Sequence, residues 1–178
     1  MYQKAKDDFL NYEEPNWIVP IFENIPEELK EQPWAVWRAE PREGHFGKFN
    51  KAPRNPVSGS PIGSNNPTAF GTFKQVQQAY QAGGYTGIGL LLTGNGIIGI
   101  DIDNLGDAID KDTNLKEWIK NARKMGAYCE QSPSGKGLRL FVKGNLERGG
   151  YKVRNLEIYA DKRFLTVTGN IIISKRET

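Results

Sequence analysis

The pattern of apolar and polar positions predicts several short strands and two amphipathic helices. Apolar residues at helical spacing mark 70–84 and 115–126, and each of these segments ends at glycine. Strand patterns follow the order WAVWRA (34–39), GIGLLLT (87–93), IIGIDID (97–103), AYCEQS (127–132), LRLFVK (138–143), VRNLEIYA (153–160), RFLTVTG (163–169) and a short IIIS (171–174). The tripeptide Gly94-Asn95-Gly96 predicts a tight hairpin between the second and third of these strands.

This order of elements predicts an α+β fold, in which helices cover one face of an antiparallel sheet. An RRM-like sheet with extra strands has this order of elements. Residues 41–68 are rich in proline and glycine and are predicted to form a loop. Residues 1–32 are predicted to be an acidic, partly helical lead-in, and residues 33–178 to form the main domain.

Composition narrows the class of protein. The 178 residues are 38% hydrophobic and 25% charged, which is typical of a globular chain. No apolar run approaches the roughly 20 residues that span a bilayer, the N-terminus does not resemble a signal peptide, and the single Cys129 excludes an internal disulfide. We therefore expect a cytoplasmic protein with no membrane partner, in which Cys129 is a small buried residue.

Charge is distributed unevenly along the chain. The net charge is only +3, but the stretches 38–54 and 120–154 are basic. A basic surface beside an acidic site suits an enzyme that acts on phosphates. The alternative is that these basic residues are ordinary solvated side chains on the surface.

The most informative residues are two aspartates at the end of an apolar strand. Asp101 and Asp103 are two apart, so they share a face and lie about 6.5 Å from each other along the strand. Two such carboxylates repel each other unless a cation or a proton neutralises them, which favours a site for Mg²⁺ or Mn²⁺. The alternative is a strand end that runs into solvent.

A second informative segment joins two predicted strands. Its glycines let backbone N–H groups approach an anion, its serines donate hydroxyl hydrogen bonds, and its cations supply positive charge. These candidate phosphate-binding residues are Ser132, Ser134, Gly135, Lys136, Gly137 and Arg139. The alternative is an ordinary glycine-rich hairpin with charged residues on its surface.

A third informative segment contains an acidic residue inside a strand pattern. Glu157 alternates with Leu156 and Ile158 and shares its face with Tyr159. A carboxylate in a central strand costs free energy unless it is paired or bound to metal. Glu157 is therefore a candidate third metal ligand, and a salt bridge to Arg163 is the alternative.

In order, IDID, SPSGKGLRLF and LEIYADKRFLTVTG resemble the three motifs of the archaeo-eukaryotic primase superfamily, above all the primase–polymerase domains of phages and plasmids. KAPRNPVSGSPIGSNNPTAFGTF also resembles the N-terminal region of those domains, where Phe70 stands in place of a common tryptophan. The resemblance covers about residues 33–170. It implies an RRM-like antiparallel sheet core of the primase type with an N-terminal α/β extension.

The resemblance also implies a two-metal nucleotidyl transferase that acts as a DNA primase or polymerase in the replication of a phage, plasmid or other mobile element. Asp101, Asp103 and Glu157 would be the catalytic residues that hold Mg²⁺ or Mn²⁺. The serine- and glycine-rich turn would bind the triphosphate of the nucleotide substrate, and single-stranded DNA would be the template. The family's histidine position is Arg139 here, which preserves a phosphate-binding charge but not a titrating imidazole.

The sequence offers further candidate contacts outside these three segments. Lys48, Lys51, Arg54 and Arg163 are candidate template or phosphate contacts, with solvated surface charges as the alternative. Phe141 and Tyr159 are candidate base or sugar contacts. Both Trp34 and Trp37 are predicted to lie in the core. A helicase would act with this domain, either in the same longer chain or as a separate protein.

Three other classes compete with this interpretation. A non-catalytic single-stranded DNA-binding module would keep the basic and aromatic surface but has no use for a carboxylate cluster. A rolling-circle nickase or relaxase needs paired histidines, whereas His45 is the single histidine of the chain. A metal-dependent glycosyltransferase with a DxD motif requires a longer chain.

Overall fold

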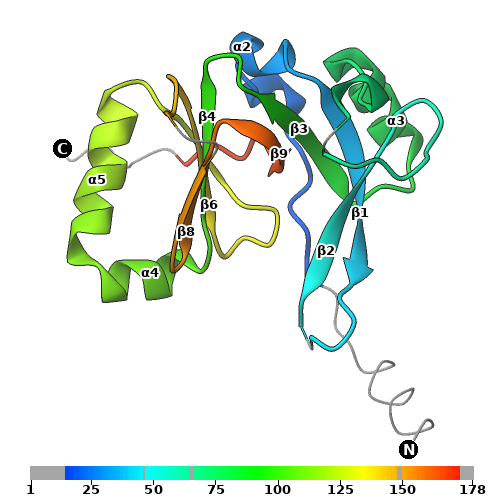
Figure 1. Cartoon of the computed structure of the whole chain (residues 1–178). Coiled ribbons are helices and arrows are strands. Elements are labelled where there is room, and N and C mark those ends of the chain that lie inside the picture. Colours follow the sequence, from blue (N-terminus) through cyan, green and yellow to red (C-terminus); the bar gives the residue numbers. More distant parts are fainter. Residues whose placement is uncertain (1–14, 46, 65, 148–149, 173–178) are drawn as a thin grey trace, which may run out of the picture.

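Two antiparallel sheets, each flanked by helices, make up the computed structural model, which describes residues 15–45, 47–64, 66–147 and 150–172 (Figure 1). The first sheet has the strand order β2 (Phe49–Arg54), β1 (Trp34–Pro41), β3 (Gly87–Thr93) and β9 (Asp161–Val167). The second has the order β5 (Tyr128–Gln131), β6 (Leu138–Lys143), β4 (Ile97–Ile102), β8 (Leu156–Tyr159) and β7 (Gly150–Val153). The α+β class predicted from the sequence is therefore confirmed.

Each sheet packs against helices of its own (Figure 1). Helices α4 (Leu105–Lys111) and α5 (Thr113–Lys124) lie on the second sheet, and α3 (Phe73–Ala82) lies beside the first. Three short elements complete the described part of the chain, namely η1 (Phe22–Asn24), α2 (Glu27–Lys30) and η2 (Pro67–Ala69). No helix in these described ranges is both long and apolar enough to cross a membrane.

Local sequence signals account for the two longer helices. A capping box begins α3, since the Thr72 hydroxyl accepts a hydrogen bond from the Gln75 N–H and the Gln75 side chain accepts one from the Thr72 N–H. Gly83 then ends α3 at a φ of 94°, as the sequence predicted. The second predicted helix is confirmed as α5, although it begins two residues earlier, at Thr113.

Several strand predictions need correction. The turn at 94–96 joins β3 to β4, but the two strands do not pair and belong to different sheets, so the predicted hairpin is wrong. The segment 153–160 is not one strand, because Arg154 adopts a left-handed φ of 52° and separates β7 from β8. Residues 41–68 are not all loop, since β2 pairs with β1 there.

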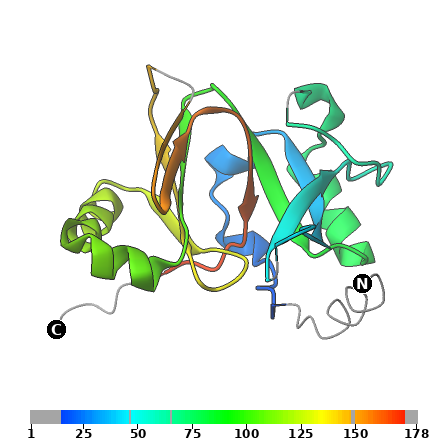
Figure 2. The ribbon, with the colours of Figure 1, turned by 60° about the horizontal axis from the view of Figure 1, so that its bottom comes forward.

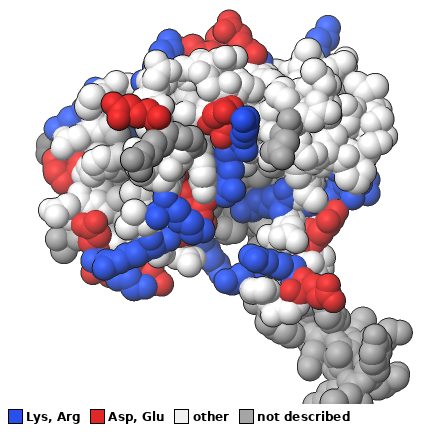
Figure 3. All heavy atoms as spheres, viewed as in Figure 1, with Lys and Arg blue, Asp and Glu red and all other residues white. Residues whose placement is uncertain are grey.

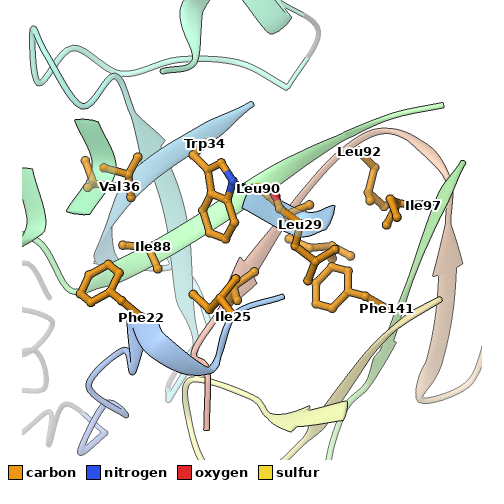
Figure 4. Packing of buried hydrophobic residues seen from close by; sticks show 13 residues of the cluster. Phe22, Ile25, Leu29, Trp34, Val36, Ile88, Leu90, Leu92, Ile97 and Phe141 are labelled. Atoms are coloured by element: carbon orange, nitrogen blue, oxygen red, sulfur yellow. Dashed lines mark hydrogen bonds between the residues drawn. The ribbon is translucent and has the colours of Figure 1, made fainter. Parts of the chain in front are cut away.

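The space between the sheets is filled by an apolar cluster at one end (Figure 4). Trp34 and Leu90 of the first sheet meet Phe141 of the second in this cluster, together with Phe22 and Leu29 from the segment that precedes β1. Trp34 and Trp37 are 0% and 1% exposed, which confirms that both lie in the core. Phe141 is only 3% exposed, so its predicted contact with a base or sugar is wrong.

A second apolar cluster lies between the second sheet and its helices. Ile100, Ile102 and Leu140 point to this side and pack with Ala108 of α4 and, more peripherally, Ile119 of α5. Because neighbouring positions on a strand point to opposite faces, the alternate residues Ile97, Gly99 and Asp101 face the first sheet. We call the face of the second sheet that is turned toward the first its inner face. Cys129 is buried in the second cluster, as predicted.

Strand β9 belongs to the first sheet but packs closely against the inner face of the second. A Cβ atom on Gly99 would lie 2.2 Å from Leu165 Cδ1 and 3.0 Å from Leu92 Cδ1. Gly99 stands between Ile97, which joins the apolar cluster, and Asp101. The inner face therefore has an apolar end and a charged end, with the contact to β9 between them. Figure 2 shows the space between the sheets from another side.

This close approach predicts that Gly99→Ala destabilises the protein. The added methyl group must displace Leu165 and Leu92, so we expect the free energy of unfolding to fall by about 1–3 kcal/mol in denaturant titrations. Gly106→Ala is the matched control, because a Cβ there meets nothing within 4 Å and alanine favours the helix. Equal stability of the two variants would contradict this packing.

Candidate active site

One charged side chain from each strand of the second sheet forms a row across its inner face. Register pairs Glu130 with Arg139, Arg139 with Asp101, Asp101 with Glu157, and Glu157 with Lys152. Directly opposed residues of an antiparallel sheet share a face and stand about 4.5–5.5 Å apart at Cβ. We call these five residues the charged row. It brings together three residues that the sequence predicted for one site, namely Asp101, Arg139 and Glu157.

The centre of the charged row is a buried ion pair. Arg139 donates from Nε to Asp101 Oδ1 at 3.3 Å and from Nη2 to Asp101 Oδ2 at 3.1 Å. Arg139 Nη1 also donates to the Thr166 carbonyl oxygen of β9 at 2.7 Å. Arg139 is 3% exposed and the Asp101 side chain 13%. Arg139 therefore connects the second sheet to β9 of the first while it holds Asp101.

Glu157 is enclosed by cationic and phenolic donors. It accepts hydrogen bonds from Lys152 Nζ, from Arg163 Nη2 at 2.8 Å and from the Tyr159 hydroxyl at 3.0 Å. Burial acts to raise the pKa of Glu157, but these donors and charges outweigh it and hold the pKa below its usual value. The salt bridge to Arg163, considered as an alternative to metal binding, is present in the structure.

Asp103 and Lys51 lie at the open end of the site. Asp103 follows the end of β4 directly and is exposed, and partial desolvation, followed by the Asp101 charge, raises its pKa. Lys51 of β2 approaches from the first sheet and is half-buried. Burial, and then the Arg139 charge, lower the pKa of Lys51 to about 8, while the Asp101 and Asp103 charges oppose this shift. Lys51 is thus close enough to both aspartates for their charges to act on it.

The serine- and glycine-rich turn joins β5 to β6 and packs against the end of β4. The Ser132 hydroxyl accepts from the Gly137 N–H at 2.9 Å, and the Lys136 carbonyl accepts from the Leu105 N–H at 2.8 Å. A Cβ on Gly137 would lie 2.6 Å from the Ile102 carbonyl oxygen, so this approach requires glycine. Ser132 is buried, Ser134 and Gly135 are half-buried, and Lys136 is exposed.

Glu130 is a part of the charged row that the sequence did not identify. It is 0% exposed and accepts from the Thr168 N–H at 2.9 Å, the Gly169 N–H at 2.7 Å and the Tyr128 hydroxyl at 2.9 Å. Burial raises the pKa of Glu130 to about 7, although these donors and Arg139 favour its charged form. The signal was available, because an acidic residue interrupts the strand pattern AYCEQS.

The remaining candidates are distributed around the site. Arg54 pairs with Glu40 at 2.9 Å and occupies the opposite face of β2 from Lys51, so the structure does not bring it to the aspartates. Lys48 is exposed just before β2. Tyr159 lies beside the charged row, and the Arg163 guanidinium is 4.4 Å from the centroid of its ring.

The donor chemistry of the site suits a hard divalent ion, because Asp101, Asp103 and Glu157 supply carboxylate oxygens. Among the residues that the structure describes, however, no three acidic, histidine or cysteine side chains are already arranged to hold a metal. Two of these carboxylates are instead bound to basic side chains. The site as a whole combines four acidic groups with four basic ones, namely Asp101, Asp103, Glu130 and Glu157 with Lys51, Arg139, Lys152 and Arg163.

No family model matches the chain. In an alignment of 147 positions that covers 78% of the chain, it is 31% identical to a protein named DNA Primase-polymerase from Nitratiruptor phage NrS-1. The matching region is 19% of that protein, so the chain spans about a fifth of the length of this curated relative.

Proposed function

Because the chain carries a domain of the phage primase–polymerase family, we propose that it catalyses template-dependent nucleotidyl transfer as a DNA primase or DNA polymerase. The process would be the replication of a phage, plasmid or other mobile element. The observation that carries this proposal is the charged row, in which register sets Asp101 between Arg139 and Glu157. Three weak motifs that are far apart in the sequence thereby supply neighbouring side chains on one face.

The fold supports the finer assignment to an RRM-like sheet of the primase type. Helices α4 and α5 cover one face of the second sheet and leave the charged row on the other. The first sheet, with α3, would then correspond to the N-terminal α/β extension of this fold. Lys51 brings a residue of that extension to the aspartates.

In this proposal the protein's own groups bind and orient the substrates. Asp101, Asp103 and Glu157 would hold Mg²⁺ or Mn²⁺, which when bound activates the attacking 3′-hydroxyl and stabilises the leaving pyrophosphate. Lys51 and Arg139 would bind the triphosphate and stabilise the charge that develops on it. The turn from Ser132 to Gly137 would close the side of the site next to Asp103.

A single-stranded DNA template would bind along the basic surface. Figure 3 shows lysine and arginine side chains gathered around a hollow between the two sheets. The exposed Lys48, Lys152 and Arg163 belong to elements on the two sides of this space. Phosphate contacts of this kind position the strand without reading its sequence. We also propose that the domain acts together with a helicase and that the protein is cytoplasmic.

A second candidate function is a single-stranded DNA-binding module without catalysis. It is favoured by the ion pairs themselves, since Asp101 and Glu157 already have cationic partners. Such a module would bind DNA through the basic surface. Its Asp101 and Glu157 carboxylates would only hold the Arg139 and Arg163 side chains in place.

The test is incorporation of labelled nucleotides on single-stranded DNA, with and without a primer, in Mg²⁺, Mn²⁺ or EDTA. A variant without the Asp101 and Asp103 carboxylates reveals any contaminating polymerase. We expect metal-dependent products that require both aspartates, and the unprimed reaction decides whether the domain starts chains. Equal DNA binding by both proteins with no incorporation by either would favour the binding module.

Lys51 is expected to contribute to nucleotide binding. Lys51→Met should raise the KM for the nucleoside triphosphate about 10- to 100-fold, because a charge-assisted hydrogen bond in a half-buried site is lost. In the wild-type protein the KM should also rise above pH 8, since the pKa of Lys51 is lowered to about 8 and its charge is lost there. Lys74→Met, which removes an exposed charge on α3, should change the KM less than about twofold. Equal effects of the two substitutions would exclude this role for Lys51.

A further inference from the structure

Arg139 neutralises the very carboxylate that the proposed reaction requires for metal binding. Its guanidinium bonds both oxygens of Asp101 through Nε and Nη2. A guanidinium stays protonated at all working pH values, unlike the imidazole that the resemblance leads one to expect at this position. Asp101 can therefore lose its cationic partner only if the Arg139 side chain moves or finds another anion.

The surroundings of Arg139 make such an exchange feasible. Nη1 donates to the Thr166 carbonyl at 2.7 Å, and this contact does not involve Asp101. The carboxylate of Glu130, directly opposite Arg139 on the other side, is fixed by the Thr168 and Gly169 N–H groups. The guanidinium is thus retained on β9 and beside a second carboxylate when its contacts to Asp101 are released.

Charge balance decides what can release Asp101. The acidic and basic groups of the site are equal in number, and Glu157 is held by Lys152 and Arg163 in the same manner as Asp101 by Arg139. A divalent cation that arrives alone would leave the buried Arg139 with no carboxylate hydrogen-bonded to it, which is costly. A triphosphate that arrives with the cation offers Arg139 a new anionic partner of matching bidentate geometry.

We propose that Arg139 makes metal binding at Asp101 depend on the nucleotide, by passing from the Asp101 carboxylate to the substrate's phosphates. This inference rests on the proposed function and deepens it, since it names the metal–triphosphate complex, and not the free ion, as the species that the site accepts. Arg139 acts as a positioning residue that sets the order of binding. The coupling must be reciprocal, and we expect each ligand to tighten the other about 10- to 100-fold.

The first test measures Mn²⁺ binding by the intact chain with electron paramagnetic resonance, with no nucleotide present. Wild type should bind Mn²⁺ at least about 10-fold more weakly than Arg139→Gln, in which Asp101 has no cationic partner. Arg42→Gln, which removes an exposed loop arginine, is the matched control and should behave like wild type. Tight Mn²⁺ binding by wild type alone, equal to that of Arg139→Gln, would overturn the inference.

The second test measures binding of a fluorescent, non-hydrolysable dATP analogue by anisotropy, in Mg²⁺ and in EDTA. The ratio of the two dissociation constants reports the coupling, and it should be at least about 10-fold larger in wild type than in Arg139→Gln or Arg139→Lys. Each variant loses the direct contact between residue 139 and the phosphates in both buffers, so this loss does not change the ratio. If Arg139→Gln fails to fold, Arg139→Lys still decides, because lysine keeps the buried positive charge but cannot bond both oxygens of Asp101 as the guanidinium does.

The outcomes separate this inference from the proposed function. If the analogue does not bind wild type at any metal concentration, the nucleotidyl transfer proposal fails and the inference fails with it. If the analogue binds but the Mn²⁺ affinity of the protein is the same with and without it, the proposed function stands and only the role of Arg139 is overturned.

Discussion

Replacing Asp101 and Asp103 together by asparagine is expected to lower nucleotide incorporation by at least about 10³-fold while the chain stays folded. Both substitutions remove negative charge from the end of β4 without changing side-chain size. The asparagine at 101 can still accept a hydrogen bond from Arg139, so the contact between β6 and β9 need not be lost. The rate is measured as primer extension on single-stranded DNA, and folding as thermal unfolding.

The matched control for this variant is Asp107→Asn/Asp110→Asn. Both of these carboxylates are exposed on α4, which covers the opposite face of the second sheet. The control removes the same amount of charge from the same region of the chain, and we expect it to retain the wild-type rate within about twofold. An active double variant at positions 101 and 103 would show that these carboxylates do not take part in catalysis.

Glu130→Ala is expected to have the largest effect on stability, lowering the free energy of unfolding by about 3–5 kcal/mol at pH 7. The substitution leaves the Thr168 and Gly169 N–H groups and the Tyr128 hydroxyl without their common acceptor. It also removes the carboxylate that faces Arg139 across the strand pair. Chemical denaturation measures the loss, and Glu117→Ala on the exposed side of α5 should cost less than about 1 kcal/mol.

The pH dependence of this loss follows from the raised pKa of Glu130. In the unfolded chain the carboxyl group titrates near 4.5, and in the folded protein near pH 7. The folded state therefore binds more protons between these values, and wild-type stability falls as the pH rises from 4.5 to 7. The cost of Glu130→Ala should be greater at pH 5 than at pH 7, by about 2 kcal/mol. A cost that does not vary with pH would indicate that Glu130 is already ionised in the folded protein at pH 5.

Strand positions could be predicted because alternation is a local property, whereas strand partners are not. Residues 87–93 form a nearly continuous apolar run, and β3 is accordingly buried on both faces and paired on both edges. That continuity predicts a strand buried on both faces, but it does not say which strands pair with it. The glycines at 94 and 96 specify a tight turn, but they do not specify that the two strands pair.

The missed strands have identifiable causes. Pro53 suggested loop, but it faces Trp37 from β2 at the edge of the first sheet, where the missing N–H is tolerated. Asn155 was a turn signal inside the predicted strand 153–160, and the chain does reverse there. In both places the local sequence is compatible with a strand and with a turn, and the contacts to the rest of the sheet determine which of the two forms.

The site was predictable to the extent that it depends on alternation along single strands. This placed Asp101 with Asp103, and Glu157 with Tyr159, on common faces. The register between strands, which sets Arg139 and Glu157 on either side of Asp101, depends on non-local pairing. Glu130 was missed as a site residue for the same reason, since it is held by backbone groups beyond β9. Lys51 was predicted as a template or phosphate contact, but its place beside the aspartates could not be predicted, because it comes from the other sheet.

The place of β9 in the first sheet has a consequence for how the chain is made. Ile88 of β3 pairs with Val167, so roughly 80 residues must leave the ribosome after β3 before its edge is covered. In that interval the apolar strand exposes unpaired backbone N–H and C=O groups, which are prone to aggregate. We therefore expect the nascent chain to need chaperone protection and to complete the first sheet only after the strands of the second have been synthesised.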